Sequence, residues 1–429
     1  MTLSKPANPL YSDYRRHVDL LVSAAINAAD PGAAIAKHLR REDDKLLIGR
    51  EPDVERFDLN WGRVYLVAAG KAAIPMTRAA AAILGDSLEQ GIVITKDTGA
   101  PQTDALAGLP ISLHEAGHPV PDERGVRATR AAVNMLSGVR REDAVVCLIS
   151  GGASALLTDP LLPLKDWRKL IELLLKSGCS INELNTVRRA VDRIKSGGLA
   201  RAASPASTYG LILSDVVGNP ITIIGSGPTV VEDDLVVGAV KVLGRYDIAR
   251  QLDRTEWGRL ALALNQARTS HKAERPSVRN IIVGDVRDAA TAAMLCAIRL
   301  GFVGQLLTVH LDGHAREVGR LAAGIARDLP PGHCLILGGE TTVTVRGNGQ
   351  GGRNQELALA AAIAMDRLPR AVVCSFATDG EDGPTSAAGA AVTGQTASLA
   401  RSLGLNPVAL LVNNDSHTFF SRLDTQSRG

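Results

Sequence analysis

The sequence has few cysteines and few aromatic residues, and it has no long apolar run. Its five cysteines are scattered, odd in number and without a CxxC pair, which excludes a disulfide framework and a cysteine-rich metal site. No apolar run approaches the roughly 18 residues of a membrane span, and the N-terminus lacks the apolar core of a signal peptide. We therefore expect a cytoplasmic protein with reduced thiols and no membrane partner.

The charge of the chain is nearly balanced, with 48 Lys and Arg against 45 Asp and Glu, and gives no sign of a nucleic-acid surface. A hydrophobic content of 45% and a charged content of 22% are typical of a globular protein. At roughly 100–200 residues per domain, 429 residues suggest two or three domains. We expect a small-molecule ligand, and the sequence leaves open whether the protein forms a homo-oligomer.

Three short apolar strands in the first half of the chain end in polar turns. Residues 64–69 run into Gly70 and Lys71, and residues 211–213 end at Ser214 and Asp215. Open α/β sheets bind ligands where strands end. A lysine there could hold a carboxylate or phosphate, and an aspartate could bind magnesium or act as a general base. A solvated lysine and a turn-forming aspartate are the structural alternatives.

The third strand, 144–148, leads into a turn with two glycines between two serines. Such a turn before a helix can cradle a phosphate with its backbone N–H groups. No GxxxxGK[ST] sequence occurs in the chain, so this is not a Walker A loop. The turn consists of Ser150, Gly151, Gly152, Ala153 and Ser154.

Two further patterns precede residue 200. His114 to His118 matches HExxH, but the zinc motif requires a helix, and Gly117 and the prolines that follow predict a loop. Ser180 and Glu183 form a capping box for a helix. We expect this helix to continue to residues 196–198. Its cations, Arg188, Arg189, Arg193 and Lys195, predict a solvated face, although all but Arg193 are also candidates for reaching an anionic ligand.

A second series of elements begins near residue 280, after a polar helical stretch. We expect strands at 280–283, 304–310, 334–337, 342–345, 371–376 and 407–412, and helices at 288–300, 313–328 and 353–367. Some antiparallel pairing is expected within 334–346. The resulting division is an N-terminal α/β domain over 1–235, a helical connector over 236–279 and a C-terminal α/β domain over 280–429. The first helices are candidates for packing on the C-terminal domain.

The glycine-rich residues 347–352 are compatible with two chemistries. They fit GxGxxG, which indicates dinucleotide binding when an acidic residue follows about 20 residues later. Asp379 is the candidate, although it lies somewhat further along the chain, and Arg353 and Asn354 differ from the small residues expected after the motif. Phosphoryl transfer would use glycine turns around the phosphates, carboxylates for magnesium, and Lys or Arg on the transferred group. The chain has all of these at expected strand ends.

Taken together, the motifs over about residues 65–415 resemble those of the class II glycerate 2-kinases, whose C-terminal domain is of the MOFRL type. The motifs that carry the resemblance lie at 69–73, 115–122, 150–154, 184–186, 214–220, 225–229, 338–342, 351–356 and 378–383. The resemblance implies two α/β/α domains, the first Rossmann-like with a mainly parallel sheet and the second with a mixed sheet, and an active site in the cleft between them.

The resemblance also implies the reaction. It is ATP-dependent phosphorylation of D-glycerate at the 2-hydroxyl, giving 2-phosphoglycerate and ADP, with Mg²⁺. Members of the family are often labelled hydroxypyruvate reductases, so an NAD(P)H-dependent reductase of glycerate and tartrate metabolism is the rival hypothesis. Family members continue beyond residues 414–416 with a further strand and a glycine-rich segment. This chain instead ends in a polar stretch, so we expect a shortened C-terminal domain.

Site roles follow from the family motifs at matching positions. Lys71 and Arg353 match the family's cleft cations, and Asp215 is the candidate for activating the hydroxyl. The metal candidates are Asp215, Glu340 and Asp379. The candidates for binding ATP are residues 150–154 as named above, together with Gly227, Gly339, Glu340, Thr341, Gly351, Gly352 and Asn354.

Overall fold

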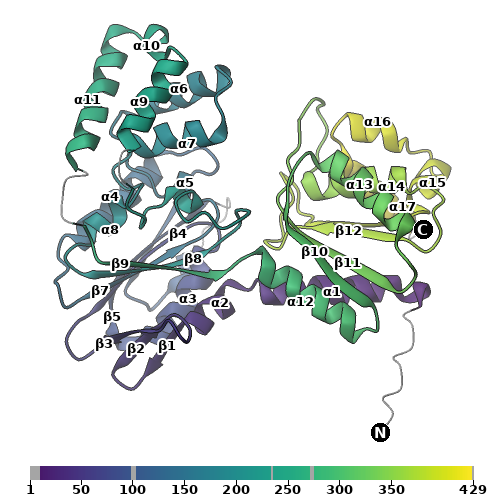
Figure 1. The fold of residues 1–429 in the computed structure, drawn as a ribbon, viewed down its shortest axis with the longest axis horizontal. Helices are drawn as coiled ribbons and strands as arrows, with labels where there is room; N and C mark the ends of the chain where they lie inside the picture. Colours follow the sequence, from purple (N-terminus) through teal and green to yellow (C-terminus); the bar gives the residue numbers. More distant parts are fainter. Residues whose placement is uncertain (1–9, 98–102, 233–234, 271–274, 428–429) are drawn as a thin grey trace. The chain divides into compact units, whose positions relative to one another are not determined.

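The structure is a computed structural model that describes residues 10–97, 103–232, 235–270 and 275–427. The chain forms two compact units (Figure 1). Unit 1 contains the described residues up to Asp30, the short stretch Val216–Gly218, and Asp285 onward, whereas unit 2 contains Pro31–Asp215 and Asn219–Gly284. The described residues of 236–279, predicted as a connector, therefore form helices and the start of a strand that belong to unit 2.

Unit 2 is built on a six-stranded sheet in which every strand pairs in parallel with its neighbours. The strand order is β6-β5-β4-β7-β8-β9. It reverses direction between β4 and β7, as in doubly wound sheets that bind ligands at that point. The strands are β4 (Val64–Ala69), β5 (Leu88–Lys96), β6 (Ile111–Ala116), β7 (Ala144–Ile149), β8 (Ser207–Leu213) and β9 (Val278–Gly284).

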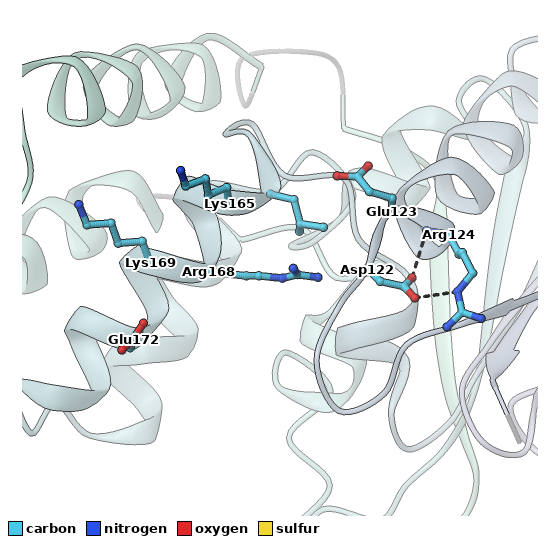
Figure 2. Close-up of a pocket in the computed structure, with 8 residues that line it drawn as sticks. Asp122, Glu123, Arg124, Lys165, Arg168, Lys169 and Glu172 are labelled. Atoms are coloured by element: carbon cyan, nitrogen blue, oxygen red, sulfur yellow. Dashed lines mark hydrogen bonds and ion pairs between the residues drawn. The ribbon is translucent and has the colours of Figure 1, made fainter. Parts of the chain in front are cut away.

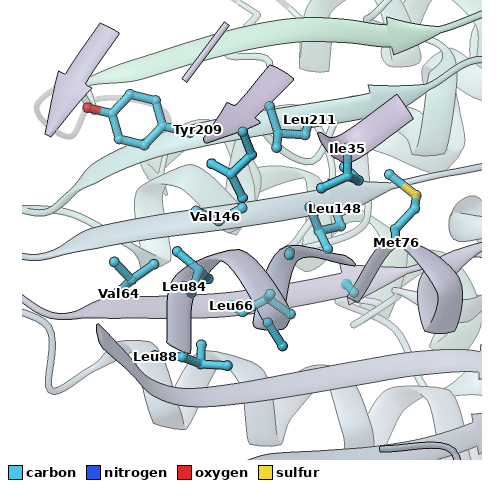
Figure 3. Close-up of a cluster of buried hydrophobic side chains, with 14 of the residues drawn as sticks. Ile35, Val64, Leu66, Met76, Leu84, Leu88, Val146, Leu148, Tyr209 and Leu211 are labelled. Atoms are coloured by element: carbon cyan, nitrogen blue, oxygen red, sulfur yellow. The ribbon is translucent and has the colours of Figure 1, made fainter. Parts of the chain in front are cut away.

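Helices cover both faces of a parallel sheet, so its central strands are apolar throughout. Every residue of β7 is buried. Leu66, Leu148 and Leu211 extend from three strands into one core, where Ile35 and Met76 of the covering helices meet them (Figure 3). Those helices are α2 (Pro31–His38) and α3 (Ala73–Leu84), while α4 (Glu123–Leu136) packs on β5 and β6. A small antiparallel sheet joins this core, formed by β1 (Leu39–Glu42), β2 (Lys45–Ile48) and β3 (Glu55–Asp58).

A group of helices in unit 2 has a hydrophobic core of its own, separate from the sheet (Figure 1). Trp167, Leu170 and Leu174 pack against Leu243 and Leu264 there. The predicted capping box at Ser180 and Glu183 is confirmed. The group consists of α6 (Leu164–Lys176), α7 (Ile181–Ala190), α9 (Leu235–Arg245), α10 (Ile248–Gln251) and α11 (Arg254–Ser270). Two short helices, α5 (Ala153–Leu156) and α8 (Gly198–Ala202), follow glycine turns nearby.

Unit 1 contains two two-stranded sheets between helices. β10 (Val303–Leu311) pairs in parallel with β11 (His333–Gly339), and β12 (Val372–Phe376) pairs antiparallel with β13 (Gly389–Thr393). Its helices are α1 (Tyr14–Ala28), α12 (Val286–Arg299), α13 (Ala315–Asp328), α14 (Arg353–Ala364), α15 (Thr396–Ser402), α16 (Pro407–Val412) and α17 (Ser416–Ser427). α1 packs against α12, and both contribute alanines to one small core.

Three predictions for the second half of the chain are wrong. The strand predicted at 280–283 is β9, which pairs with β8 in unit 2 rather than beginning the second unit. Residues 342–345 form no strand, and β11 pairs in parallel with β10 instead of antiparallel within 334–346. Residues 407–412 form a helix, because the Asn406 side chain caps it and Pro407 occupies its first turn.

The described residues after 415 form α17, so the polar residues 421–427 continue a helix that begins at Ser416. Phe419 is fully buried against Leu359, Ala400 and Leu405, so one face of this helix belongs to the core of unit 1.

Among the described residues, no single helix is long and apolar enough to span a membrane. Two helical segments joined at a bend, Tyr11–Ala28 and Pro31–His38, together reach the required length and composition. All five cysteines are free thiols, as predicted.

Candidate functional site

Two turns meet where the strand order of unit 2 reverses. The turn after β4 donates from Lys71 N to Gly151 O at 2.8 Å and from Ala72 N to Ser150 Oγ at 3.1 Å. Gly70 has a φ of +129°, and a Cβ there would lie 2.2 Å from Ser150 Oγ. The main chains therefore approach closely, and only glycine fits at residue 70.

Three exposed polar side chains surround the glycines of residues 150–154, here called the 150–154 turn. A Cβ at Gly151 would lie 2.0 Å from Asp215 Oδ2. A Cβ at Gly152 would lie 3.1 Å from His118 Nε2 and 3.5 Å from Lys71 Cγ. The structure thus brings the predicted Lys71 and Asp215 to the same turn. It adds His118, which belongs to the family motif at 115–122 and to the rejected HExxH match but was not among the predicted site residues.

A second glycine loop, residues 225–229, lies beside the 150–154 turn. Ser154 Oγ and Ser226 Oγ are hydrogen-bonded at 2.9 Å. Gly225 and Gly227 have φ values of +59° and +60°, so both adopt the left-handed conformation that glycine tolerates. The predicted Gly227 therefore neighbours the 150–154 turn through the Ser154–Ser226 contact.

α7 ends at Ala190, so Arg193 and Lys195 lie beyond the helix that was predicted to carry them. Arg193 is half exposed and pairs with Asp159, whereas the other three cations are engaged inside the protein. Arg189 pairs with Glu232 and donates to Thr222 O at 3.1 Å. The Arg188 guanidinium lies 5.7 Å from the centre of the Trp167 ring, and burial lowers its pKa. Lys195 is fully buried, so the prediction that it could reach an anionic ligand is wrong.

Residues 346–350 of unit 1 form a loop, here called the 346–350 loop. Its backbone N–H groups donate to residues 413–415. Arg346 N and Gly347 N donate to Asn414 Oδ1 at 2.8 and 3.1 Å. Gln350 N donates to Asp415 Oδ1 at 3.1 Å, and Asn348 N and Gly349 N both donate to Asn413. Residues 347–350 of the GxGxxG pattern therefore donate their N–H groups to the residues just before α17, so these four groups do not face a pyrophosphate.

The N-terminus of α14 also has an anion from within the chain. Asp382 is 1% exposed and accepts from Asn354 N at 2.9 Å and Gln355 N at 2.8 Å. The side-chain amides of the same two residues donate to it at 3.2 Å each. The sequence alone places Asp382 beside a glycine, as at a metal–phosphate site or in an Asp-Gly turn, whereas its carboxylate caps a helix distant in sequence.

Arg353 and Glu340 form an ion pair at the start of α14, and both side chains remain partly open to solvent, at 38% and 43%. Gly339, with a φ of +155°, lets β11 end against Leu311, and the buried Thr341 follows. Asp379 is exposed on the loop after β12 and accepts from Glu381 N at 3.2 Å. Unit 1 therefore brings Arg353 and Glu340 together.

No group of three or more His, Cys, Asp or Glu side chains suited to a metal ion occurs in the part of the chain that the structure describes. His114 lies on β6 and His118 in the loop beyond it, so the HExxH residues are not on a helix, as predicted.

A hollow of about 590 Å³ on unit 2 lies between the start of α4 and α6 (Figure 2). Several of its charged side chains have partners: Arg124 pairs with Asp97 and Asp122, and Lys169 pairs with Glu256. None of the predicted site residues lines it.

Family comparisons agree with the motifs described above. Residues 17–260 match the family described as Domain of unknown function (DUF4147), and residues 333–428 match the MOFRL family. The D-glycerate 2-kinase of Thermotoga maritima is 40% identical over 84% of this chain and 85% of its own length. The chain belongs to the glycerate kinase family. This confirms the resemblance found in the sequence.

Other members of the glycerate kinase family extend the comparison. The crystal structure of glycerate kinase from Thermotoga maritima superposes with a TM-score of 0.81 at 36% identity, covering 96% of this chain and 95% of that one. A protein of Agrobacterium vitis named putative hydroxypyruvate reductase is 36% identical over 94% of this chain and 88% of its own length. The family therefore carries both names that the sequence analysis anticipated.

The packing around Gly152 predicts a loss of stability for Gly152→Ala. A left-handed φ of +88° costs a non-glycine residue about 1–2 kcal/mol, and the new methyl group would also contact the His118 ring. Gly178→Ala is the matched control, because its φ is +77° and nothing lies within 4 Å of its Cβ position. Urea unfolding should show a larger loss for Gly152→Ala, and equal losses would contradict the described contact.

The buried carboxylate of Asp382 predicts a second effect on stability. Asp382→Ala leaves two backbone and two side-chain N–H groups without their acceptor. We expect unit 1 to lose about 2–4 kcal/mol in urea unfolding. Asp328→Ala, at an exposed position at the end of α13, should change stability by less than about 0.5 kcal/mol. A similarly small effect for Asp382→Ala would contradict its capping role.

Proposed function

We propose that the chain transfers the γ-phosphoryl group of ATP to the 2-hydroxyl of D-glycerate, giving 2-phosphoglycerate and ADP. The observation that carries this proposal is the 40% identity to a D-glycerate 2-kinase over 84% of the chain. Lys71, Asp215 and the 150–154 turn at the switch point of a Rossmann-like sheet support it.

Unit 2 would supply the positioning of the phosphates and the activation of the hydroxyl. The 150–154 turn and Gly227 would approach the phosphates with their backbone. The Lys71 ammonium would neutralise charge on the transferred group or on the glycerate carboxylate. Asp215 would accept the proton of the 2-hydroxyl as its oxygen attacks the γ-phosphorus and the bond to ADP breaks.

Unit 1 would supply Arg353. Its guanidinium would stabilise charge on the three equatorial oxygens of the phosphoryl group in the transition state. Glu340, its ion-pair partner, would hold the guanidinium in orientation before the substrate arrives. The neighbouring Gly339, Thr341, Gly351, Gly352 and Asn354 remain proposed ATP contacts, although Asn354 also serves the Asp382 cap.

Magnesium fits the oxygen donors of this proposal. Mg²⁺ commonly takes one or two carboxylates together with substrate phosphates and waters, so a three-residue protein cluster is not required. Asp215 offers an exposed carboxylate directly beside Gly151, and Glu340 and Asp379 are the further candidates. The ion would neutralise charge on the β- and γ-phosphates.

The rival function is an NAD(P)H-dependent hydroxypyruvate reductase, which the name of the Agrobacterium vitis relative favours. The reductase would need a dinucleotide loop, for which residues 347–352 are the candidate. The N–H groups of residues 346–350 donate to residues 413–415, and this argues against that role.

A paired assay on one sample tests both functions. We expect release of ADP that depends on D-glycerate and magnesium, and no oxidation of NADH or NADPH with hydroxypyruvate. ADP release without glycerate serves as the background. Oxidation of NAD(P)H without glycerate-dependent ADP release would overturn the kinase proposal.

Substitution of the two cations tests the assignment of roles. We expect Lys71→Ala and Arg353→Ala each to lower kcat/KM by about 10³, the scale of phosphoryl-stabilising cations. Arg320→Ala, at an exposed helical site of unit 1, is the matched control and should retain its turnover. Near-wild-type turnover in both cation variants would contradict the assignment.

A further inference from the structure

Lys195 is among the largest fully buried side chains of the described residues, and its ammonium group points at the 150–154 turn. Nζ donates to Ser154 O at 2.8 Å and to Leu157 O at 3.0 Å. These two carbonyls lie at the two ends of the single helical turn that follows Gly152. The side chain therefore fixes where that turn begins and ends.

The backbone beside Lys195 holds the second glycine loop. Ser196 N donates to Ser226 O at 3.1 Å, and Gly197 N donates to Gly227 O at 2.8 Å. Leu199 N continues the series by donating to Pro228 O at 3.0 Å. One short segment thus binds the 150–154 turn with its side chain and the 225–229 loop with its main chain.

Close packing against Val231 explains why residue 197, two positions after Lys195, is a glycine. Gly197 has a φ of +80°, and a Cβ there would lie 2.6 Å from Val231 Cγ2. The Ser154 Oγ to Ser226 Oγ hydrogen bond closes the connection between the two loops. A shift of Lys195 would therefore move both loops relative to each other.

The surroundings of the ammonium group are sparsely charged. Asp192 Oδ2 lies 3.6 Å from Nζ, and this aspartate also accepts from Thr158 Oγ1 at 2.5 Å and from the N–H groups of Asp159 and Ile194. Arg188 is the other charged group that influences Lys195. Lys195 and Asp192 form a fully buried ion pair. Such a pair adds little to the free energy of unfolding, whereas removing one partner alone leaves an unpaired buried charge and is costly.

We propose that Lys195 is a positioning residue for ATP, which sets the separation between the 150–154 turn and the 225–229 loop. The proposal rests on the proposed kinase function for the identity of the ligand. Lys195 touches neither substrate, since its side chain is enclosed by protein. Its effect is to hold two glycine loops in the geometry that the phosphates require.

The test compares Lys195→Met with the wild-type chain. Methionine has a similar length but leaves the carbonyls of Ser154 and Leu157 without their donor. A hydrogen bond to a charged donor changes an equilibrium constant by about tenfold or more. We therefore expect the turn to leave its binding-competent position and KM for ATP to rise about tenfold. KM for D-glycerate should stay within about twofold. Lys176→Met, on the exposed face of α6, should change neither constant.

Hydrogen exchange provides a readout that needs no turnover. In Lys195→Met the amides of residues 150–157 and 225–230 should exchange at least about tenfold faster, while the buried strands β4 and β7 keep their protection. Unchanged exchange at both loops would overturn the proposal. Faster exchange throughout unit 2, or an equal rise of both KM values, would also overturn it by showing general destabilisation.

The exchange result also separates the positioning role of Lys195 from the proposed kinase function. A wild-type chain without glycerate-dependent ADP release would overturn the proposed function. In that case, coupled loss of protection at the two loops would still show that Lys195 holds them.

The pH dependence of stability gives an independent check. Burial lowers the pKa of Lys195 from 10.5 to about 8, against the opposing attraction of Asp192. Between these values the unfolded chain binds one more proton here than the folded chain, so this group makes folding more favourable as pH rises. The stability difference between wild type and Lys195→Met should therefore grow from pH 8 to 10. A flat difference would contradict the described burial of the ammonium group.

Discussion

The architecture of unit 2 depends on the close approach of two main chains at the carboxyl ends of β4 and β7. Gly70 lies against Ser150, and the N–H groups of Lys71 and Ala72 donate across the contact. Any side chain at residue 70 would separate the two turns. The strand order reverses there, and this is the point where doubly wound sheets bind ligands. One steric constraint thus fixes how the two turns pack at the switch point of the sheet.

In unit 1, the backbone N–H groups of the 346–350 loop and of the start of α14 donate to acceptors within the chain. A glycine-rich sequence pattern therefore does not by itself show that these groups bind a phosphate. Helix N-termini and glycine turns attract anions because their N–H groups have no partner within the element. In α14 that need is met by Asp382, and in the 346–350 loop by the side chains and backbone of residues 413–415. An anion supplied by the chain removes the reason for a bound phosphate at the same N–H groups. The guanidinium of Arg353, which is 38% exposed, is by contrast open to an external anion.

The sequence predicted what depends on local pattern. Buried strands such as β4 and β7 are continuous apolar runs, and the capping box of α7 is a four-residue signal, so both were found. The strand predicted at 407–412 was wrong because an apolar run alone cannot distinguish a strand from a helix, although Asn406 and Pro407 carried the correct signal. The assignment of β9 was wrong because its partner, β8, is distant in sequence. Lys71 and Asp215 were found from strand ends, whereas the proximity of His118 required the fold.

Lys195 shows why charge in a sequence is a poor guide to exposure. A helix with several cations is most often a solvated surface, and this is what the composition of residues 181–195 predicts. The structure instead encloses the last cation and satisfies it with carbonyl oxygens and one aspartate. Enclosing a charge is unfavourable unless such partners are present, so the partners must be held as firmly as the lysine itself. One of those partners, the Ser154 carbonyl, belongs to the turn beside Lys71, so the burial of Lys195 is tied to the position of that turn.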